Sequence, residues 1–180
     1  EFIESFNKLG EFVPVVQAGD WGEEDKKLEY KASYAIDINK TGVPIRELKL
    51  EVVESICSMA NTEGGKIIIG VNDDETICGI QPDLDKRAKK AANPVVSLKN
   101  DIIKFANSNL SRKGADYKGF SDQIEDIEID GKILLILTVS KVTNKPPVGV
   151  NGKIYRRIGD GDFPIEGDDL LIWSDERFGS

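Results

Sequence analysis

The clearest hydrophobic pattern in the chain is a run of three β-branched residues at positions 67–69 (III). A continuous apolar run between turn signals is typical of a strand that is covered on both faces. Two glycines at 64–65 precede the run and give the backbone a freedom that a Cβ would remove. The polar residues 72–75 (NDDE) follow it and predict a turn. We therefore predict that 59–80 forms a helix end, a turn, a buried strand and a return strand, with carboxylates at the hairpin tip.

A second strand is predicted by the alternation of apolar and polar residues through 28–33 (LEYKAS). A period of two is typical of a half-buried strand, in which every second side chain lies on the same face. Glu29 and Lys31 therefore share one face of this strand. On spacing alone the pair is either part of a charged site or the solvated face of an edge strand.

Helical spacing of apolar residues indicates several helices. Pro44 suits the first turn of a helix, where its missing N–H is no loss. The basic segment 81–92 is either a helix or a loop. The predicted helices are a short amphipathic one over 2–9 that ends at Gly10, one over 44–60, one that starts at Pro94, and a short final one over 168–173.

Turn signals predict two further hairpins in the second half of the chain. Asp130-Gly131 separates an alternating segment (124–129) from an apolar strand (132–140). Asn151-Gly152 precedes a strand over 153–158, and a glycine-containing loop follows. In that strand Arg156 and Arg157 lie on opposite faces, so at most one of them faces a groove.

Length and composition fit one domain with an arm. The chain has 180 residues, of which 39% are hydrophobic, and we divide it into an arm (1–20) and a domain (21–175). No run approaches the roughly 20 apolar residues of a membrane helix, and no signal peptide is evident. Cys57 and Cys78 lie in apolar contexts and are interpreted as unpaired core thiols, which favours a cytoplasmic location.

The absence of histidine and the distribution of charge limit the functions that the sequence allows. The sequence contains no histidine, which excludes Ser-His-Asp triads, Cys-His pairs and His-ligated zinc. A net charge of −8 argues against a broad nonspecific grip on nucleic acid, although a local basic strip remains compatible with it. Four basic residues in 81–92 are candidates for such a strip, or for an ordinary solvated face. They are Lys86, Arg87, Lys89 and Lys90.

Three segments together resemble one known family. Residues 60–74 (ANTEGGKIIIGVNDD) resemble the core motif of the AlbA-like domain of the Schlafen family, a module also found in bacterial regulators. Glu29-Tyr30-Lys31, with Glu24 five residues earlier, resembles the family's Glu-aromatic-Lys motif. Residues 153–165 (KIYRRIGDGDFPI) resemble its closing motif, with Asp160 where members often have Ser. The resemblance implies an α/β (α+β mixed) fold, in which helices pack against a mixed β-sheet.

The resemblance also implies a metal site. In Schlafen nucleases two glutamates and one aspartate form a three-carboxylate site that cleaves RNA. Carried over, the ligands are Glu24, Glu29 and Asp73 with Lys31 beside them, and Glu23 or Asp74 are the alternatives at either end. Such carboxylates would bind Mg²⁺ or Mn²⁺, which offsets phosphate charge and activates water.

The implied function is nucleic-acid binding, with a metal-dependent endoribonuclease acting on structured RNA such as tRNA as its catalytic form. Lys31, Arg156 and the basic residues of 86–90 would contact phosphate. A homodimer, or a place in a larger multidomain chain, is expected because animal Schlafen nucleases use two such lobes as a clamp. Two alternatives remain: a non-catalytic DNA-binding, transcription-regulatory module, and a protein-interaction platform, which the acidic balance favours.

Overall fold

The computed structural model describes residues 5–6, 12–13, 21–38, 44–111, 124–143 and 146–179. Its centre is a four-stranded sheet in the order β3-β4-β7-β6. The strands are β3 (Leu28–Lys31), β4 (Gly65–Ile69), β7 (Lys132–Val139) and β6 (Ile124–Ile129). β3 runs parallel to β4 and the other neighbours are antiparallel. The sheet is mixed, as predicted.

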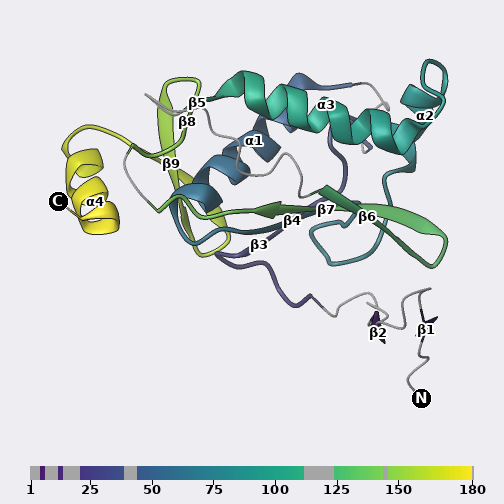
Figure 1. Ribbon diagram of the computed structural model, residues 1–180, viewed down its shortest axis with the longest axis horizontal. Helices are drawn as coiled ribbons and strands as arrows, with labels where there is room; N and C mark the ends of the chain where they lie inside the picture. Colours follow the sequence, from purple (N-terminus) through teal and green to yellow (C-terminus); the bar gives the residue numbers. More distant parts are fainter. Residues whose placement is uncertain are drawn as a thin grey trace.

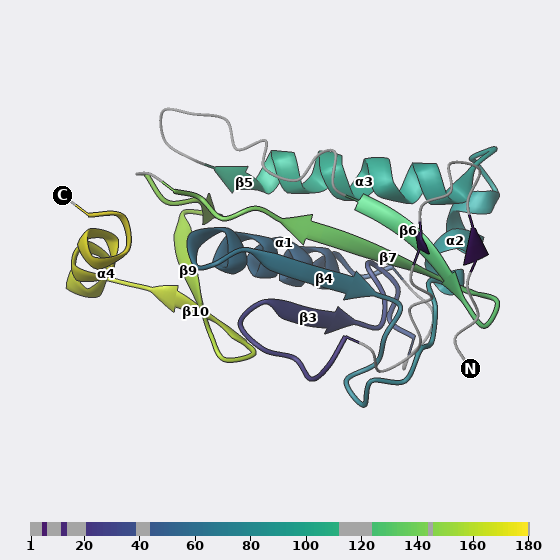
Figure 2. The same cartoon turned by 60° about the horizontal axis from the view of Figure 1, so that its bottom comes forward.

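Both faces of β4 are buried, which confirms the interpretation of its isoleucine run. Ile67 and Ile69 belong to the larger core, which contains residues of two long helices. Ile68 packs on the opposite face with Leu28 and Tyr30. The two helices are α1 (Arg46–Asn61) and α3 (Pro94–Asn109), which lie on the same side of the central sheet (Figure 1, Figure 2). A shorter helix, α2 (Gln81–Ala88), precedes α3.

A second, antiparallel sheet lies beside α1, in the order β10-β9-β8-β5. Its strands are β5 (Leu110–Ser111), β8 (Gly149–Val150), β9 (Lys153–Ile158) and β10 (Gly161–Ile165). The chain continues into α4 (Asp168–Phe178), at the left in Figure 1. Both predicted hairpin turns are confirmed, since Asp130-Gly131 and Asn151-Gly152 adopt positive φ angles between 50° and 79°.

The return strand predicted for the 59–80 hairpin is wrong. Val71 and Ile77 form only an isolated bridge, and no strand follows the turn. The reason is that β4 already pairs with β3 on one edge and with β7 on the other. The returning segment instead crosses the end of β4, where the Cys78 and Gly79 amides donate to the carbonyl of Gly70.

Other boundaries differ from the predictions. The predicted loop after Gly159 contains strand β10, and α4 continues to Phe178. Pro44 lies before α1, bridged to Ile36. The helix predicted for 2–9 is wrong at Ser5–Phe6, because these residues form strand β1, which pairs with β2 (Phe12–Val13). The other residues of the predicted helix lie outside the described part of the chain.

No helix in the described ranges is long and apolar enough to cross a membrane. The two cysteines are free thiols, with Cys57 buried and Cys78 half-buried. Burial raises the pKa of Cys57 to about 12, so its thiolate, the reactive form, is scarce at neutral pH.

We expect Cys57 to resist alkylation in the folded protein and to react once the protein is unfolded. The more exposed Cys78 should react faster, although burial raises its pKa as well. Mass spectrometry of iodoacetamide-treated protein, with and without urea, measures both rates. Rapid modification of Cys57 without urea would contradict its placement in the core.

Candidate functional site

Glu29 lies in a buried ion-pair network between the two sheets. Its side chain is 7% exposed, and its two oxygens contact two different cations. Lys31 Nζ lies 2.5 Å from Oε1, and Arg157 Nη2 lies 2.5 Å from Oε2. Glu29 and Lys31 share the face of β3 that is turned toward α1, because they pair in register with Ile67 and Ile69 of the helix-covered face. The shared face predicted from spacing is thus confirmed, and it is not a solvated one.

Arg157 continues the network from β9. Its guanidinium side chain is 0% exposed and also binds Asp162 of β10, with Nη1 and Oδ1 2.9 Å apart. Asp162 in turn accepts hydrogen bonds from Ser55 Oγ, at 2.6 Å, and from Ser58 Oγ of α1. The network therefore joins β3, β9, β10 and α1 by charge-assisted hydrogen bonds, which are stronger than neutral ones.

Electrostatics favour the ionised form of both cations in this network. Burial alone would lower the pKa of Lys31, but the adjacent Glu29, together with Glu51 and Asp162, more than offsets this, so the pKa is raised. The same balance, with Glu29 and Asp162 as partners, raises the pKa of Arg157. A buried charge is tolerated when it is paired in this way.

Glu24 lies near this network, but its carboxylate binds the backbone of β3 at the edge of the sheet. Its Oε1 accepts a hydrogen bond of 2.5 Å from the backbone N–H of Tyr30, on the edge of β3 that no other described strand covers. Burial raises the pKa of Glu24, and the neighbouring charge of Glu29 acts in the same direction. The structure therefore brings Glu24 and Glu29 together, as the resemblance implied. Glu23, the alternative, is exposed.

Asp73 does not join the two glutamates. Among the described residues no group of three acidic, cysteine or histidine side chains is placed to hold a metal ion. The 72–75 turn follows β4, and its Glu75 raises the pKa of Tyr30 in addition to the larger effect of burial. Asp74, the alternative ligand, accepts a hydrogen bond of 3.1 Å from the Thr76 amide and so closes its own turn.

The carboxylates, as arranged, do not fit a divalent metal. Mg²⁺ needs oxygens that are available for near-octahedral coordination. Both oxygens of Glu29 face cations, and one oxygen of Glu24 accepts a backbone hydrogen bond. The local chemistry is that of a structural ion-pair network.

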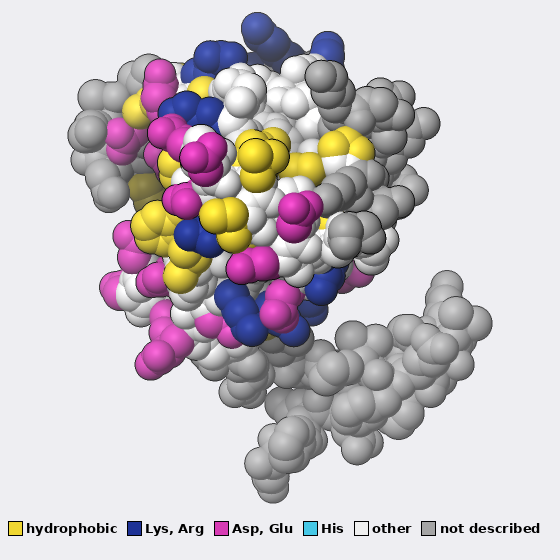
Figure 3. All heavy atoms as spheres, turned by 90° about the vertical axis from the view of Figure 1, so that its left-hand side faces the viewer, with side chains coloured by type: hydrophobic (Ala, Val, Ile, Leu, Met, Phe, Trp, Pro, Cys, Tyr) yellow, Lys and Arg dark blue, Asp and Glu magenta, His cyan; other side chains and the backbone are white. Residues whose placement is uncertain are grey.

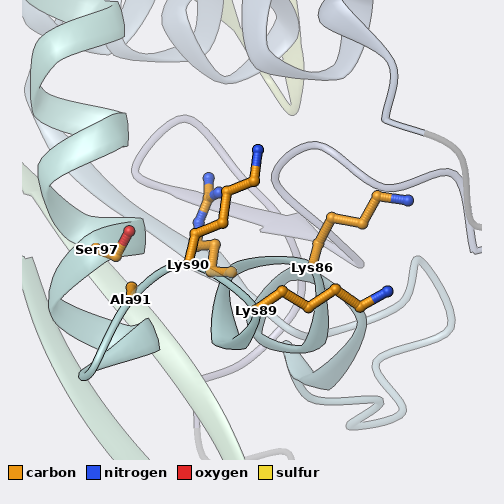
Figure 4. A pocket seen from close by; sticks show the side chains of 6 residues that line it. Lys86, Lys89, Lys90, Ala91 and Ser97 are labelled. Carbon is orange, nitrogen blue, oxygen red and sulfur yellow. The ribbon is translucent and has the colours of Figure 1, made fainter.

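The predicted basic residues do come together, at a cavity of about 430 Å³ between α2 and α3. Lys86, Lys89 and Lys90 are exposed, and none has an ion pair with a described residue. Figure 4 shows their side chains extending from the end of α2, with Lys86 and Lys89 on the same side. The cavity is lined by Lys86, Arg87, Lys89, Lys90, Ala91 and Ser97.

Arg87 differs from the three lysines because it is anchored. Its Nη2 lies 2.5 Å from Oδ2 of Asp101 on α3, and Lys49 of α1 contacts the same oxygen at 2.7 Å. The Nε–H of Arg87 is buried and has no hydrogen-bond partner among the described residues. An unpaired buried donor costs about 1–3 kcal/mol, so an acceptor oxygen that reached it would be favoured.

Arg156, the remaining predicted phosphate contact, is half-buried on β9 and lies opposite to the buried Arg157. The prediction that the two arginines occupy different faces is confirmed. Figure 3 views the molecule from the side on which α4 lies, where acidic, basic and hydrophobic side chains are interspersed. Leu171 and Ile172 of α4 are 68% and 58% exposed. The described side chains that this view shows carry charges of both signs, whereas the charged residues that line the α2 cavity are all basic.

The fold and the two charged clusters define a small α+β domain with a basic cavity at one end. The family model described as "Schlafen, AlbA_2" matches residues 24–166, most of the chain. The chain belongs to this Schlafen AlbA_2 family, as the resemblance predicted. None of the curated proteins compared matches the sequence.

Two solved structures are similar to this chain. The DIP2311 protein from Corynebacterium diphtheriae is 18% identical, with a TM-score of 0.57, and the match covers 86% of this chain and 25% of that protein. The N-terminal domain of a RecG-related protein from Nitrosomonas europaea is 22% identical, with a TM-score of 0.44, and the match covers 81% and 86% of the two chains. The chain thus spans a quarter of the length of the DIP2311 protein, and this likeness concerns the fold alone.

Several residues that organise the charged network were not predicted. The sequence indicates Arg156 rather than Arg157 as a phosphate contact and predicts a loop at Asp162. It predicts a helix at Ser55 and Ser58 without indicating a role for either side chain. A signal existed only for Arg157, since an arginine at an inward position of a strand requires a buried anion.

Proposed function

We propose that this domain binds nucleic acid through the basic cavity between α2 and α3. The observation that carries the proposal is that Lys86, Lys89 and Lys90 line one cavity, with no acidic residue in its lining. Phosphate oxygens are the abundant anions of nucleic acids, and lysine and arginine contacts to them supply most nonspecific affinity. Membership of the Schlafen AlbA_2 family supports the same class of ligand.

The charge distribution explains how an acidic protein could act in this way. The net charge of −8 is unfavourable for a broad contact with a polyanion. A local group of lysines without a described ion pair still attracts phosphate at short range, because screening at physiological salt limits the repulsion from distant acids to about 8 Å. Affinity should therefore be modest and strongly dependent on salt.

Replacing Lys86, Lys89 and Lys90 together by alanine should weaken binding of a single-stranded oligonucleotide by about tenfold or more at moderate salt. The plot of log affinity against log salt should become shallower by about 2–3, because each lost phosphate contact removes roughly 0.7–0.9 from the slope. Fluorescence anisotropy at several salt concentrations measures both quantities.

A second triple variant controls for the change in net charge. Lys66, Lys141 and Lys153 are also exposed lysines, and they lie outside the cavity lining. Their replacement by alanine changes the net charge equally, so it should leave the slope close to that of the unmodified protein. Equal losses in the two variants would show that binding follows overall charge, and absence of binding in the unmodified protein would reject the proposal.

We propose binding without metal-dependent cleavage as the basal activity. An endoribonuclease acting on structured RNA with Mg²⁺ or Mn²⁺ would need Glu29 to leave its two cations and a third carboxylate to approach. Incubating a tRNA pool with the protein and either metal tests this directly. Cleavage that a chelator abolishes would overturn the proposal and would imply a rearranged network.

The homodimer implied by the resemblance extends the proposal. Two copies would carry two basic cavities and could hold one nucleic acid at two points, which increases apparent affinity without new contacts. Light scattering at concentrations used for binding measures the oligomeric state. A monomer at all concentrations would leave the single-site form of the proposal.

A further inference from the structure

We infer that the cavity between α2 and α3 takes a phosphate monoester at the end of a nucleic-acid strand, in preference to the phosphodiesters inside it. This inference rests on the proposed function and names the ligand of the same site.

The lining concentrates positive charge around one concave space. Four basic side chains from α2 and the turn after it line a cavity of about 430 Å³. Three of them, Lys86, Lys89 and Lys90, have no described ion pair, and Arg87 pairs with Asp101. A phosphodiester carries one negative charge, whereas a phosphate monoester carries about −1.5 to −2 at pH 7 and has three acceptor oxygens. Several cations that line one cavity therefore favour the monoester, because each additional charge–charge contact stabilises the dianion more than the monoanion.

The opposite wall adds donors that suit a compact anion. Ser97 lies in the second turn of α3 and presents its hydroxyl at the cavity (Figure 4). α3 has 16 residues, and the positive end of its dipole is at this side. Arg87 lines the cavity while its Nε–H has no partner, and Asp101 restrains its guanidinium. A ligand oxygen that reached this N–H would satisfy a donor that the fold leaves unpaired.

The test compares oligothymidines that differ only at one end. Fluorescence anisotropy is measured with strands that carry a 5′-phosphate, a 3′-phosphate or hydroxyls at both ends, and thymidine monophosphate is used as a competitor. We expect one phosphorylated strand to bind about tenfold more tightly than the unphosphorylated one, the effect of about one charge-assisted hydrogen bond. If the monophosphate competes equally well, the phosphate monoester is confirmed as the ligand, but its source is a free nucleotide and the strand-end assignment is overturned.

Two variants test where the preference arises. Lys86→Ala and Ser97→Ala should each reduce it, whereas the exposed Lys153→Ala, which lies outside the lining, should preserve it. Thermal melting verifies that all three are folded. Equal affinity for all strands would overturn this inference and leave the proposed function intact, while no binding of any strand would reject both. A preference that survives Lys86→Ala and Ser97→Ala would place the monoester elsewhere.

Discussion

Replacing Glu29 by alanine is expected to lower the free energy of unfolding by about 3–5 kcal/mol, which is the typical cost of leaving a buried charge without its partner. The substitution removes the carboxylate that pairs with both Lys31 and Arg157. Arg157 is the more affected of the two, because its side chain is wholly buried and cannot reach water. Asp162 would remain as its only described carboxylate partner.

Urea denaturation followed by circular dichroism measures this loss. Glu63→Ala is the matched control, since Glu63 also contacts two lysines but does so at the surface, where solvent screens the pairs. We expect little change in stability for Glu63→Ala. Similar stability of Glu29→Ala and the unmodified protein would show that the Glu29 ion pairs do not hold the sheets together.

This expectation changes how an activity measurement on Glu29 is interpreted. A loss of binding or cleavage in Glu29→Ala could follow from disruption of β3 and β9 without any role in chemistry. Glu29→Gln is the more informative variant, because the amide keeps one acceptor for Arg157 and removes only the charge. A functional defect in Glu29→Gln at unchanged stability would indicate a direct role.

The sequence predicts the elements of this fold well where the signal is local. The period of α1 and α3, the isoleucine run of β4 and the two turns with positive φ each depend on neighbouring residues. The return strand after β4 fails for a non-local reason. The edge of β4 with which the return strand would pair is occupied by β7, which lies more than sixty residues after β4 in the chain.

The two charged clusters also differ in whether their residues are close together or far apart in the sequence. The basic cluster could be predicted because Lys86, Arg87, Lys89 and Lys90 are close in sequence and lie within one helix and the turn that follows. The Glu29 network could not, because Glu29 and Arg157 are separated by 128 positions and Ser55 and Asp162 by 107. The resemblance identified Glu29 as important but assigned it a metal, while the structure gives it two cations.

The ANTEGG segment (60–65) connects the end of α1 to the second sheet by hydrogen bonds. Asn61 is fully buried and donates to the carbonyls of Val148 and Tyr155, at 2.8 and 2.9 Å, while its Oδ1 accepts from the Val148 amide. Thr62 Oγ1 accepts from the backbone N–H of Arg157 at 3.1 Å. These residues attach the second sheet to the end of α1, so the motif holds β9 and its inward arginine in place.

Gly64→Ala should destabilise the protein by about 3 kcal/mol or more, and Gly131→Ala should cost only about 1–2 kcal/mol. Both glycines have a φ of +73°, so both substitutions place alanine in the left-handed region. They differ in the space around the added Cβ, which would meet nothing within 4 Å at Gly131 but would lie 2.6 Å from the Val139 carbonyl oxygen at Gly64.

The difference between the two variants isolates the steric effect, because the backbone cost is shared. Chemical denaturation of both gives this difference directly. At Gly64 the obstruction is backbone of β7, which cannot rotate away as a side chain can, so the overlap must be relieved by moving β7 or the turn before β4. Equal losses would mean that the left-handed φ alone requires glycine here. A much larger loss for Gly64→Ala would show that close approach to β7 also requires it.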